Sequence, residues 1–479
     1  MIFTLVWLLT EGTRADDMNA PYPIPKNFRP PAIASKRSDR FPSVNERIKI
    51  YMSDWYAPPC PDNSNGLARY RYNASSDSEF PTLIIQEPRD RLNSSMYVMT
   101  STIEADTAFF LDRPTLLECI RPEGKGNARL AHRIVGPRSN MLLYCSDAVQ
   151  SVLTAYDHIA WERTLFDTAH DNQRNQNQPK DDFPPLLLQF GDLRHSHIYR
   201  FMDLPHIKKF RSATTRDELE RVTSPTCIQD ARSAVQTPHT NPGQRQLQPL
   251  VWKLATSRHF RLLYKVHRYD TPWHEKINMA VFRGQLTGAI DGFTKGLNDE
   301  QNCLNLRRCR LVYKHGNSSL VHAKLTSTRN RIPNVLNGVN LMGEAVTIRR
   351  LLQYKAIIML EGNDVASGLK WALLSQSVVL MPEPKHTSWA LEELLQSWVH
   401  YIPLNENATD VEEKMQWIVD HDDMAQRISE RGTLWMEDLV FHPDALEDDR
   451  LIQEEMLRRY ATHFIYDESL TGKSQVDPL

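Results

Sequence analysis

Two short segments place small and charged residues where a strand is expected to end. In the first, IIMLEGNDVASGLKWALL, a buried strand over Ile357–Leu360 is followed by a turn, and Ser367 is a candidate N-cap for a helix over Gly368–Leu374. A helix N-terminus at the carboxyl edge of a parallel sheet offers free N–H groups and partial positive charge. Gly362 would let the backbone approach a ligand closely, and Lys370 would add a point charge. The segment predicts a phosphate or diphosphate site, and the alternative is an ordinary strand-to-helix turn.

The second segment, NMAVFRGQLTG, ends a predicted strand in Arg283-Gly284 and turns through Thr287. An arginine at a strand end can hold phosphate oxygens with two parallel N–H bonds, although a surface salt bridge is the commoner arrangement. Glu392 allows two interpretations as well: a hydrogen bond to a ribose, or a favourable carboxylate in the first turn of a helix.

A third segment, in the first half of the chain, also places a carboxylate where a strand is expected to end. The run LLLQFGD predicts a short buried strand that stops at Gly191-Asp192. A carboxylate at such a position can take a proton from a hydroxyl, but an aspartate after a strand is usually a turn residue.

The elements that must position these residues are those of an α/β protein. After a polar stretch at about 223–249, strand and helix patterns alternate with short connections, which favours a parallel sheet wrapped by helices. A capping box at Thr409 and Glu412 predicts a helix start, and WALEELLQ predicts another helix. We expect an N-terminal tail over 1–45, a first domain over 46–250 and a second domain over 251–479.

Composition excludes several classes of function. The formal net charge of −2 over 479 residues provides no general basic field for nucleic acid or an anionic membrane. The six cysteines have no zinc-ligand spacing, so we expect no metal site. The apolar run Met1–Leu9 is a candidate signal or membrane anchor, and with four glycosylation sequons it favours the lumen of the endoplasmic reticulum or Golgi.

Four motifs in order resemble one enzyme family. FRGQLTG, YKAIIMLEGNDVASGLKWALLSQSVVLMPEP, SWALEELLQSWVHYIPL and DDMAQRISERG look like glycosyltransferase family 90, which contains Rumi-type protein O-glucosyltransferases, capsule xylosyltransferases and lipopolysaccharide-modifying enzymes. The resemblance implies a GT-B-like architecture, with two Rossmann-like domains facing a cleft. It also implies an inverting reaction without a metal or another cofactor.

The resemblance also implies roles for individual residues. Asp192 corresponds to the general base. The residues implied to bind the nucleotide sugar are Arg283, Gly284, Thr287, Gly362, Asn363, Asp364, Ala366, Ser367, Lys370, Trp371 and Glu392. Gln285 departs from the serine of the Rumi-type branch, which leaves the donor sugar open.

The function expected from the sequence is transfer of a sugar, glucose or xylose, from a UDP-sugar to a hydroxyl of a glycan or glycoprotein. A dinucleotide-dependent oxidoreductase would use a similar sheet edge, but no G-x-G-x-x-G opens a predicted strand-helix-strand unit. The other alternative is a catalytically inactive relative that binds glycans or a partner protein.

Overall fold

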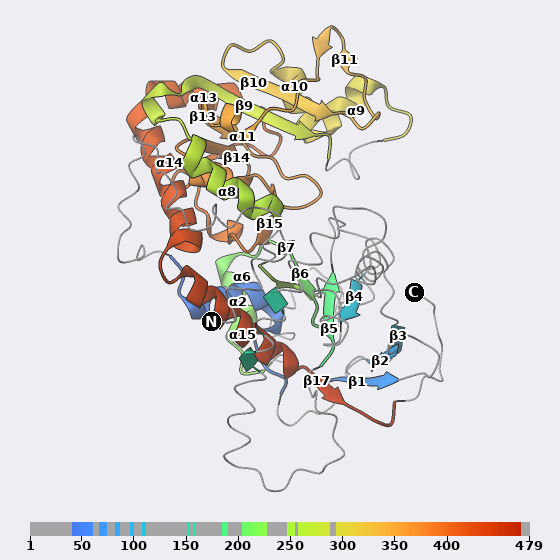
Figure 1. Cartoon of the computed structure of the whole chain (residues 1–479). Coiled ribbons are helices and arrows are strands. Elements are labelled where there is room, and N and C mark those ends of the chain that lie inside the picture. The colour runs from blue at the N-terminus through green and yellow to red at the C-terminus, as the bar shows by residue number, and fades with distance from the viewer. Residues whose placement is uncertain are drawn as a thin grey trace, which may run out of the picture. The chain divides into compact units, whose positions relative to one another are not determined.

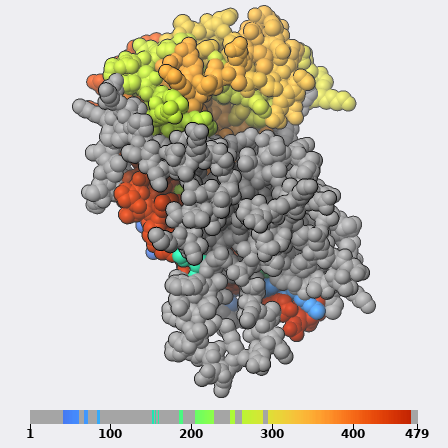
Figure 2. All heavy atoms as spheres, in the orientation of Figure 1, coloured from blue at the N-terminus to red at the C-terminus, as the bar shows by residue number. Residues whose placement is uncertain are grey.

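The computed structural model describes residues 41–60, 67–73, 82–86, 96–99, 108–111, 151–152, 155, 158–159, 184–189, 204–227, 247–253, 257–287 and 294–470, which are coloured in Figures 1 and 2. The chain divides into two compact units. Unit 1 comprises Met1–Phe41 and Thr256–Ala445, and unit 2 comprises Pro42–Ala255 and Leu446–Leu479. The second predicted domain ran to residue 479, whereas the structure groups residues 446–479 with unit 2. The predicted base Asp192 and most of the predicted tail over 1–45 lie outside the described residues.

Unit 1 is built on a five-stranded parallel sheet with the strand order β10-β9-β13-β14-β16 (Figure 1). The α/β fold predicted from the sequence is therefore confirmed for this unit, and the GT-B-like pairing of two domains stays a prediction. The strands are β9 (Ile277–Gln285), β10 (Val321–Ser327), β13 (Tyr354–Ile358), β14 (Val378–Met381) and β16 (Ile402–Pro403).

Apolar runs account for the central strands, since all residues of β13 and β14 are buried. Buried residues of three helices, for example Cys303, Leu311 and Ile418, form one hydrophobic core cluster. The sheet contributes residues such as Ala280 and Phe282 to the same cluster. These helices are α9 (Asp299–Asn305), α10 (Arg307–Lys314) and α13 (Val411–Asp420). A disulfide between Cys303 and Cys309 joins α9 to α10.

The remaining elements of unit 1 complete the layers around the sheet. The helices α8, α11, α12 and α14 pack against one another or against neighbouring strands (Figure 1). Their bounds are α8 (Ser257–Tyr269), α11 (Ile348–Leu351), α12 (Leu369–Leu374) and α14 (Asp422–Met436), which a π-helix, η7 (Glu437–Phe441), follows. Short pieces are η5 (Trp273–Glu275), β11 (Val335–Leu336), β12 (Val339–Asn340), β15 (His386–Ser388) and η6 (Glu392–Leu394).

Three local predictions in unit 1 are wrong. Ser367 does not cap a helix, because α12 begins at Leu369 after Gly368 and has no side-chain cap. The N-cap of α13 is Asp410 rather than Thr409, whose hydroxyl accepts a hydrogen bond from Asn405 Nδ2 instead. The helix expected in WALEELLQ is only the single 3-10 turn η6, since Leu391 adopts a left-handed conformation with φ of 60°.

Unit 2 contains two four-stranded sheets. One has the order β17-β1-β2-β3 and the other β4-β5-β6-β8. The strands are β1 (Ala68–Asn73), β2 (Thr82–Gln86), β3 (Met96–Met99), β4 (Ala108–Leu111), β5 (Leu186–Gln189), β6 (Ile207–Lys208), β7 (Phe210–Ser212), β8 (Leu250–Val251) and β17 (Phe464–Tyr466). Helices of unit 2 with described bounds are α2 (Val44–Met52), η2 (Ser53–Trp55), α6 (Arg216–Thr223) and α15 (Ala445–Ala461).

The C-terminal segment holds unit 2 together. Strand β17 pairs in parallel with β1, and a buried Arg47 of α2 forms an ion pair with Asp448 of α15. The hydroxyl of Tyr460 donates to the carbonyl of Pro185 at 2.6 Å and accepts from the amide of Leu187 at 3.0 Å. The strand that leads toward Asp192 is therefore fixed by the last helix. Within the described parts of the chain, no helix combines the length and apolar composition needed to cross a membrane.

Candidate functional site

Two cations face each other near the carboxyl end of the sheet in unit 1. Arg283 of β9 and Lys324 of β10 are direct partners in the register of the two parallel strands, and both side chains are partly buried. Burial lowers the pKa of Lys324, and the charge of Arg283 lowers it further. Like charges placed opposite each other on neighbouring strands repel. A bound anion would reduce this repulsion, so the pair is a candidate anion-binding site.

The guanidinium of Arg283 is held on one side and has donors left on the other. Its Nη1 donates to the carbonyl oxygens of Phe282 and His322 at 2.7 and 2.8 Å, and its Nη2 contacts His322 Nε2 at 2.9 Å. Nε has no hydrogen-bond partner among the described residues. A guanidinium carries five N–H donors, so one N–H on Nη2 remains, together with the N–H on the buried Nε, which a ligand would reach only if the surroundings shifted.

A second arginine, Arg308 of α10, joins the ends of β9 and β13. Its Nη1 donates to Gln285 O at 2.9 Å and to Thr287 Oγ1 at 2.7 Å, while its Nη2 donates to Leu360 O at 2.6 Å. Burial lowers the pKa of Arg308 to about 10, although the nearby carboxylate of Asp364 opposes the shift. The two strand ends predicted from the sequence are therefore tied to one side chain.

Three of the predicted site residues surround Arg308. A Cβ added to Gly362 would lie 2.5 Å from Thr287 Oγ1 and 3.0 Å from Arg308 Nη2. A Cβ added to Gly284 would lie 2.9 Å from the ring of Phe282 and 3.4 Å from Arg308 Nη1. Both glycines permit a close approach that no other residue would allow without a shift. The loop after β13 is also closed on itself, since Gly362 N donates to Asp364 O at 3.2 Å.

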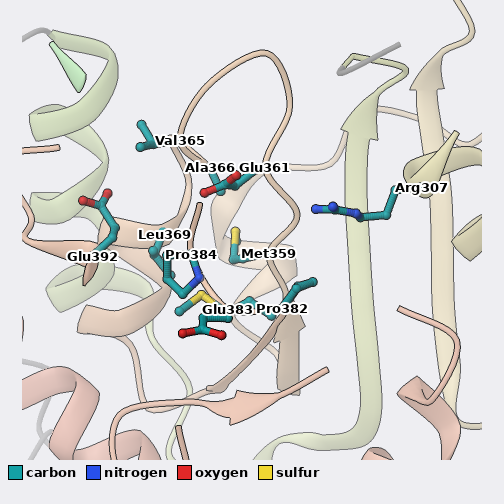
Figure 3. Close-up of a pocket in the computed structure, with 11 residues that line it drawn as sticks. Arg307, Met359, Glu361, Val365, Ala366, Leu369, Pro382, Glu383, Pro384 and Glu392 are labelled. Carbon is teal, nitrogen blue, oxygen red and sulfur yellow. The ribbon is translucent and has the colours of Figure 1, made fainter. Parts of the chain in front are cut away.

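A pocket opens where β13 and β14 end (Figure 3). Figure 3 shows Arg307 on one side of the pocket and Glu392 on the other, with Glu361 and Ala366 between them. The lining is apolar except for one arginine and three glutamates, and it comprises Arg307, Met359, Glu361, Val365, Ala366, Leu369, Met381, Pro382, Glu383, Pro384 and Glu392. The carboxylates disfavour an anion here, and the exposed Glu383 can accept a hydrogen bond from a ligand hydroxyl group.

Hydrogen bonds and ion pairs fix the wall of this pocket. Glu361 accepts from the amides of Lys385 and His386, each at 3.0 Å, and pairs with His386 Nδ1 at 2.9 Å. Glu406 forms ion pairs with both Arg307 and Lys385. The loop that follows β13 is thus connected to the segment that follows β14.

Lys370 and Glu392 form a buried ion pair beside the pocket. Lys370 Nζ lies 2.8 Å from Glu392 Oε1, and Glu392 Oε2 accepts from Ser388 N at 2.7 Å. Burial alone would raise the pKa of Glu392, but Lys370 and Ser388 outweigh it and lower that pKa below its usual value. The positive charge of Lys370 is already balanced in this structure, so its contact with a donor stays a prediction.

The other predicted site residues occupy different environments. Ala366 lines the pocket, Trp371 is buried in α12, and Ser367 is exposed. Asn363 and Asp364 are partly buried in the same loop. Among the described residues, no group of three His, Cys, Asp or Glu side chains is arranged to hold a metal ion.

The sequence interpretation missed Lys324 and Arg308. Lys324 lies in the segment VHAKLTS, where polar residues alternate with apolar ones and make the strand hard to recognise. This segment is β10, which pairs with β9. Arg308 belongs to RRCRLVYK, a basic run that resembles a solvated helix face. The adjacent Cys309 could have indicated that Arg308 is partly buried. Cys309 forms a buried disulfide with Cys303, so the start of α10 faces the interior of unit 1.

Open α/β sheets bind ligands outside the carboxyl ends of their strands, and the two cations and the glycine loop lie at that edge of this sheet. The family model of glycosyl transferase family 90 matches residues 258–467, and this part of the chain belongs to that family of glycosyltransferases. The match covers the sheet of unit 1, the pocket and both arginines.

Curated relatives are similar over shorter stretches. The O-glucosyltransferase LpsA of Dichelobacter nodosus is 40% identical over 93 residues, which are 19% of this chain and 29% of that protein. Protein O-glucosyltransferase 3 of Rattus norvegicus is 33% identical over 92 residues, 19% of this chain and 18% of that protein. Uncharacterized protein 179R of Invertebrate iridescent virus 6 is 28% identical over 189 residues, 35% and 16% of the two chains. The chain thus spans less than a third of the length of each of these relatives.

Proposed function

We propose that the protein transfers a sugar, glucose or xylose, from a UDP-sugar to a hydroxyl of a glycan or glycoprotein, with inversion and without a metal. The observation that carries the proposal is the pair Arg283 and Lys324 at the carboxyl edge of β9 and β10. A diphosphate placed there would relieve the repulsion between the two cations. It would also stabilise the charge that develops on the leaving group in the transition state.

The remaining parts of the donor fit the rest of this edge. The pocket at the ends of β13 and β14 lies two strand spacings, or about 10 Å, from the cation pair. An extended nucleotide sugar can bridge that distance. The base and ribose are assigned to the rim of the pocket, where the exposed Glu383 can accept a hydrogen bond from a hydroxyl group.

The acceptor side of the reaction rests on the family resemblance. Asp192, which follows strand β5, is assigned as the general base that deprotonates the acceptor hydroxyl. The GT-B-like arrangement of two domains and a location in the endoplasmic reticulum or Golgi belong to the same proposal. The described disulfides Cys60–Cys227 and Cys303–Cys309 support an oxidising compartment.

A thermal-shift titration with UDP, GDP and ADP in the presence of EDTA tests donor binding. We expect UDP alone to raise the melting temperature of the wild type through mass action. Lys324→Met should lose most of that shift, whereas Lys314→Met, at the exposed end of α10, should keep it. A shift that requires a divalent cation would contradict the metal-independent reaction.

A transfer assay with UDP-glucose and UDP-xylose tests catalysis. The anomeric configuration of the product, read by proton NMR, distinguishes inversion from retention. Asp192→Asn should abolish transfer while UDP still binds. If the wild type binds UDP but transfers neither sugar to any acceptor, the inactive glycan-binding alternative replaces this proposal.

A further inference from the structure

His322 of β10 lies between Arg283 and Tyr354. Its Nε2 is 2.9 Å from Arg283 Nη2, and its Nδ1 is 2.8 Å from Tyr354 Oη. Its main-chain carbonyl also accepts from Arg283 Nη1 at 2.8 Å. One residue therefore supplies two of the three acceptors that hold the guanidinium.

The chemistry of the guanidinium fixes the proton on the imidazole. Arginine has no hydrogen-bond acceptor, so the contact between Nη2 and Nε2 is a hydrogen bond only if Nε2 carries no proton. In the neutral ring the proton is then on Nδ1, which donates to Tyr354 Oη. The donors of the two hydrogen bonds therefore point the same way: Arg283 donates to His322, and His322 donates to Tyr354.

We infer that His322 is a positioning residue for Arg283, which it holds at the carboxyl end of β9 through the unprotonated Nε2 without cancelling its charge. The inference rests on the proposed role of Arg283 in binding the donor diphosphate. A carboxylate in this place would orient the guanidinium equally well, but it would also neutralise it. A neutral imidazole leaves the full charge for the phosphate oxygens.

The surroundings of His322 keep the ring neutral. Burial lowers its pKa, and the neighbouring cations Arg283, Lys324 and Arg350 lower it further, while Tyr354 contributes a hydroxyl group. Protonation in acid would turn the Nε2 acceptor into a donor that faces another donor. Arg283 would then lose this contact, and donor affinity would fall with pH.

The experiment measures the dissociation constant of UDP-glucose by calorimetry between pH 5 and 8, because both phosphates of this probe are esterified and stay ionised in that range. The His322→Leu variant should bind about tenfold more weakly at pH 8, the cost of about one lost orienting hydrogen bond. His322→Gln places an acceptor that does not titrate near Nε2, so it should bind within about threefold of the wild type. Its affinity should also stay level in acid, where that of the wild type declines.

Three results would overturn the inference. The first is wild-type affinity in His322→Leu, and the second is an identical pH profile in the wild type and His322→Gln, which decides the question even if His322→Leu does not fold. The third is a wild type that binds neither UDP-glucose nor UDP-xylose, which overturns the proposed function as well. Loss of affinity in Lys324→Met with unchanged affinity in His322→Leu would remove this inference alone.

Discussion

Lys370 Nζ lies 2.8 Å from Glu392 Oε1, and both side chains are almost fully buried. The two residues come from different elements, α12 and η6, and Ser388 completes the coordination of the carboxylate through its amide and its hydroxyl. This ion pair therefore fastens the chain that follows β14 to the helix that follows β13. It supports the pocket whether or not it touches a ligand.

Removal of one partner should be costly. Lys370→Met leaves a buried carboxylate without its cation, and we expect the free energy of unfolding to fall by roughly 3–5 kcal/mol. Lys385→Met, which removes an exposed ion pair with Glu406, should cost about 0–1 kcal/mol. Urea denaturation of both variants measures the difference. Replacement of Lys370 and Glu392 together by methionine should recover much of the loss, and a single variant as stable as the wild type would refute the stabilising role.

Gly362→Ala should disturb the loop through a steric conflict with Thr287. The added Cβ would lie 2.5 Å from Thr287 Oγ1, closer than real Cβ contacts, so the loop must shift. We expect a loss of about 1–3 kcal/mol in unfolding free energy, together with weaker UDP binding. Combining it with Thr287→Ala removes the obstructing hydroxyl and should restore part of both. Equal behaviour of the single and double variants would show that the conflict lies elsewhere.

Arg308→Met should uncouple the ends of β9 and β13. The variant keeps the apolar stem but loses the donors to Gln285 O, Thr287 Oγ1 and Leu360 O. We expect UDP affinity to fall about tenfold or more, because the loop that begins at Glu361 loses its anchor to β9. Arg329→Met is the control, since the side chain of Arg329 donates to Gln285 Oε1 at 3.1 Å from an exposed position. Calorimetry with UDP compares them, and equal affinities would contradict the anchoring role.

Glu437 should make the stability of the protein depend on pH. Burial, together with the charge of Asp438, raises the pKa of Glu437 to about 7. A carboxyl group with a raised pKa in the folded state stabilises that state while protonated, so its contribution is full below about pH 4.5 and is lost as the pH rises to about 7. The loss amounts to roughly 3 kcal/mol at most.

Glu437→Gln removes this dependence because glutamine stays neutral. Relative to the wild type, the variant should gain stability between pH 5 and 8, measured as unfolding free energy in urea. Glu430→Gln, an exposed change on α14, is the control and should follow the wild-type curve. A constant difference between Glu437→Gln and the wild type across this range would disprove the raised pKa.

The parts of the fold that the sequence predicts best are those dominated by one physical effect. Val378–Met381 is a continuous apolar run that has to be buried on both faces, and it forms β14 as predicted. Strand β10 was not predicted because His322 and Lys324 interrupt its apolar pattern. In the structure, both residues lie next to Arg283 on the neighbouring strand β9. The signal at Thr409 failed because its hydroxyl accepts a hydrogen bond from Asn405 instead, and the signal at Ser367 failed because α12 begins only at Leu369, after Gly368.

The sequence predicted the loop residues of the candidate site, but it did not predict the side-chain contacts that join its elements. Gly362 and Arg283 could be singled out from strand ends, since the edge of a parallel sheet is determined by topology. The contact of Arg308 with three different strand-end groups depends on a long side chain that crosses from another helix. Sequence spacing contains no information on that reach.

Unit 2 is assembled from two segments, Pro42–Ala255 and Leu446–Leu479, which lie on either side of the Thr256–Ala445 segment of unit 1 in the chain. During synthesis the ribosome delivers β17, one of the two strands that pair with β1, and Asp448, which forms an ion pair with Arg47, only after all of unit 1 has emerged. Unit 1 can then fold on the nascent chain while unit 2 still has one edge of β1 without its neighbouring strand β17. A growing chain is most exposed to aggregation and to chaperones in that interval, which ends when the last helix and strand arrive.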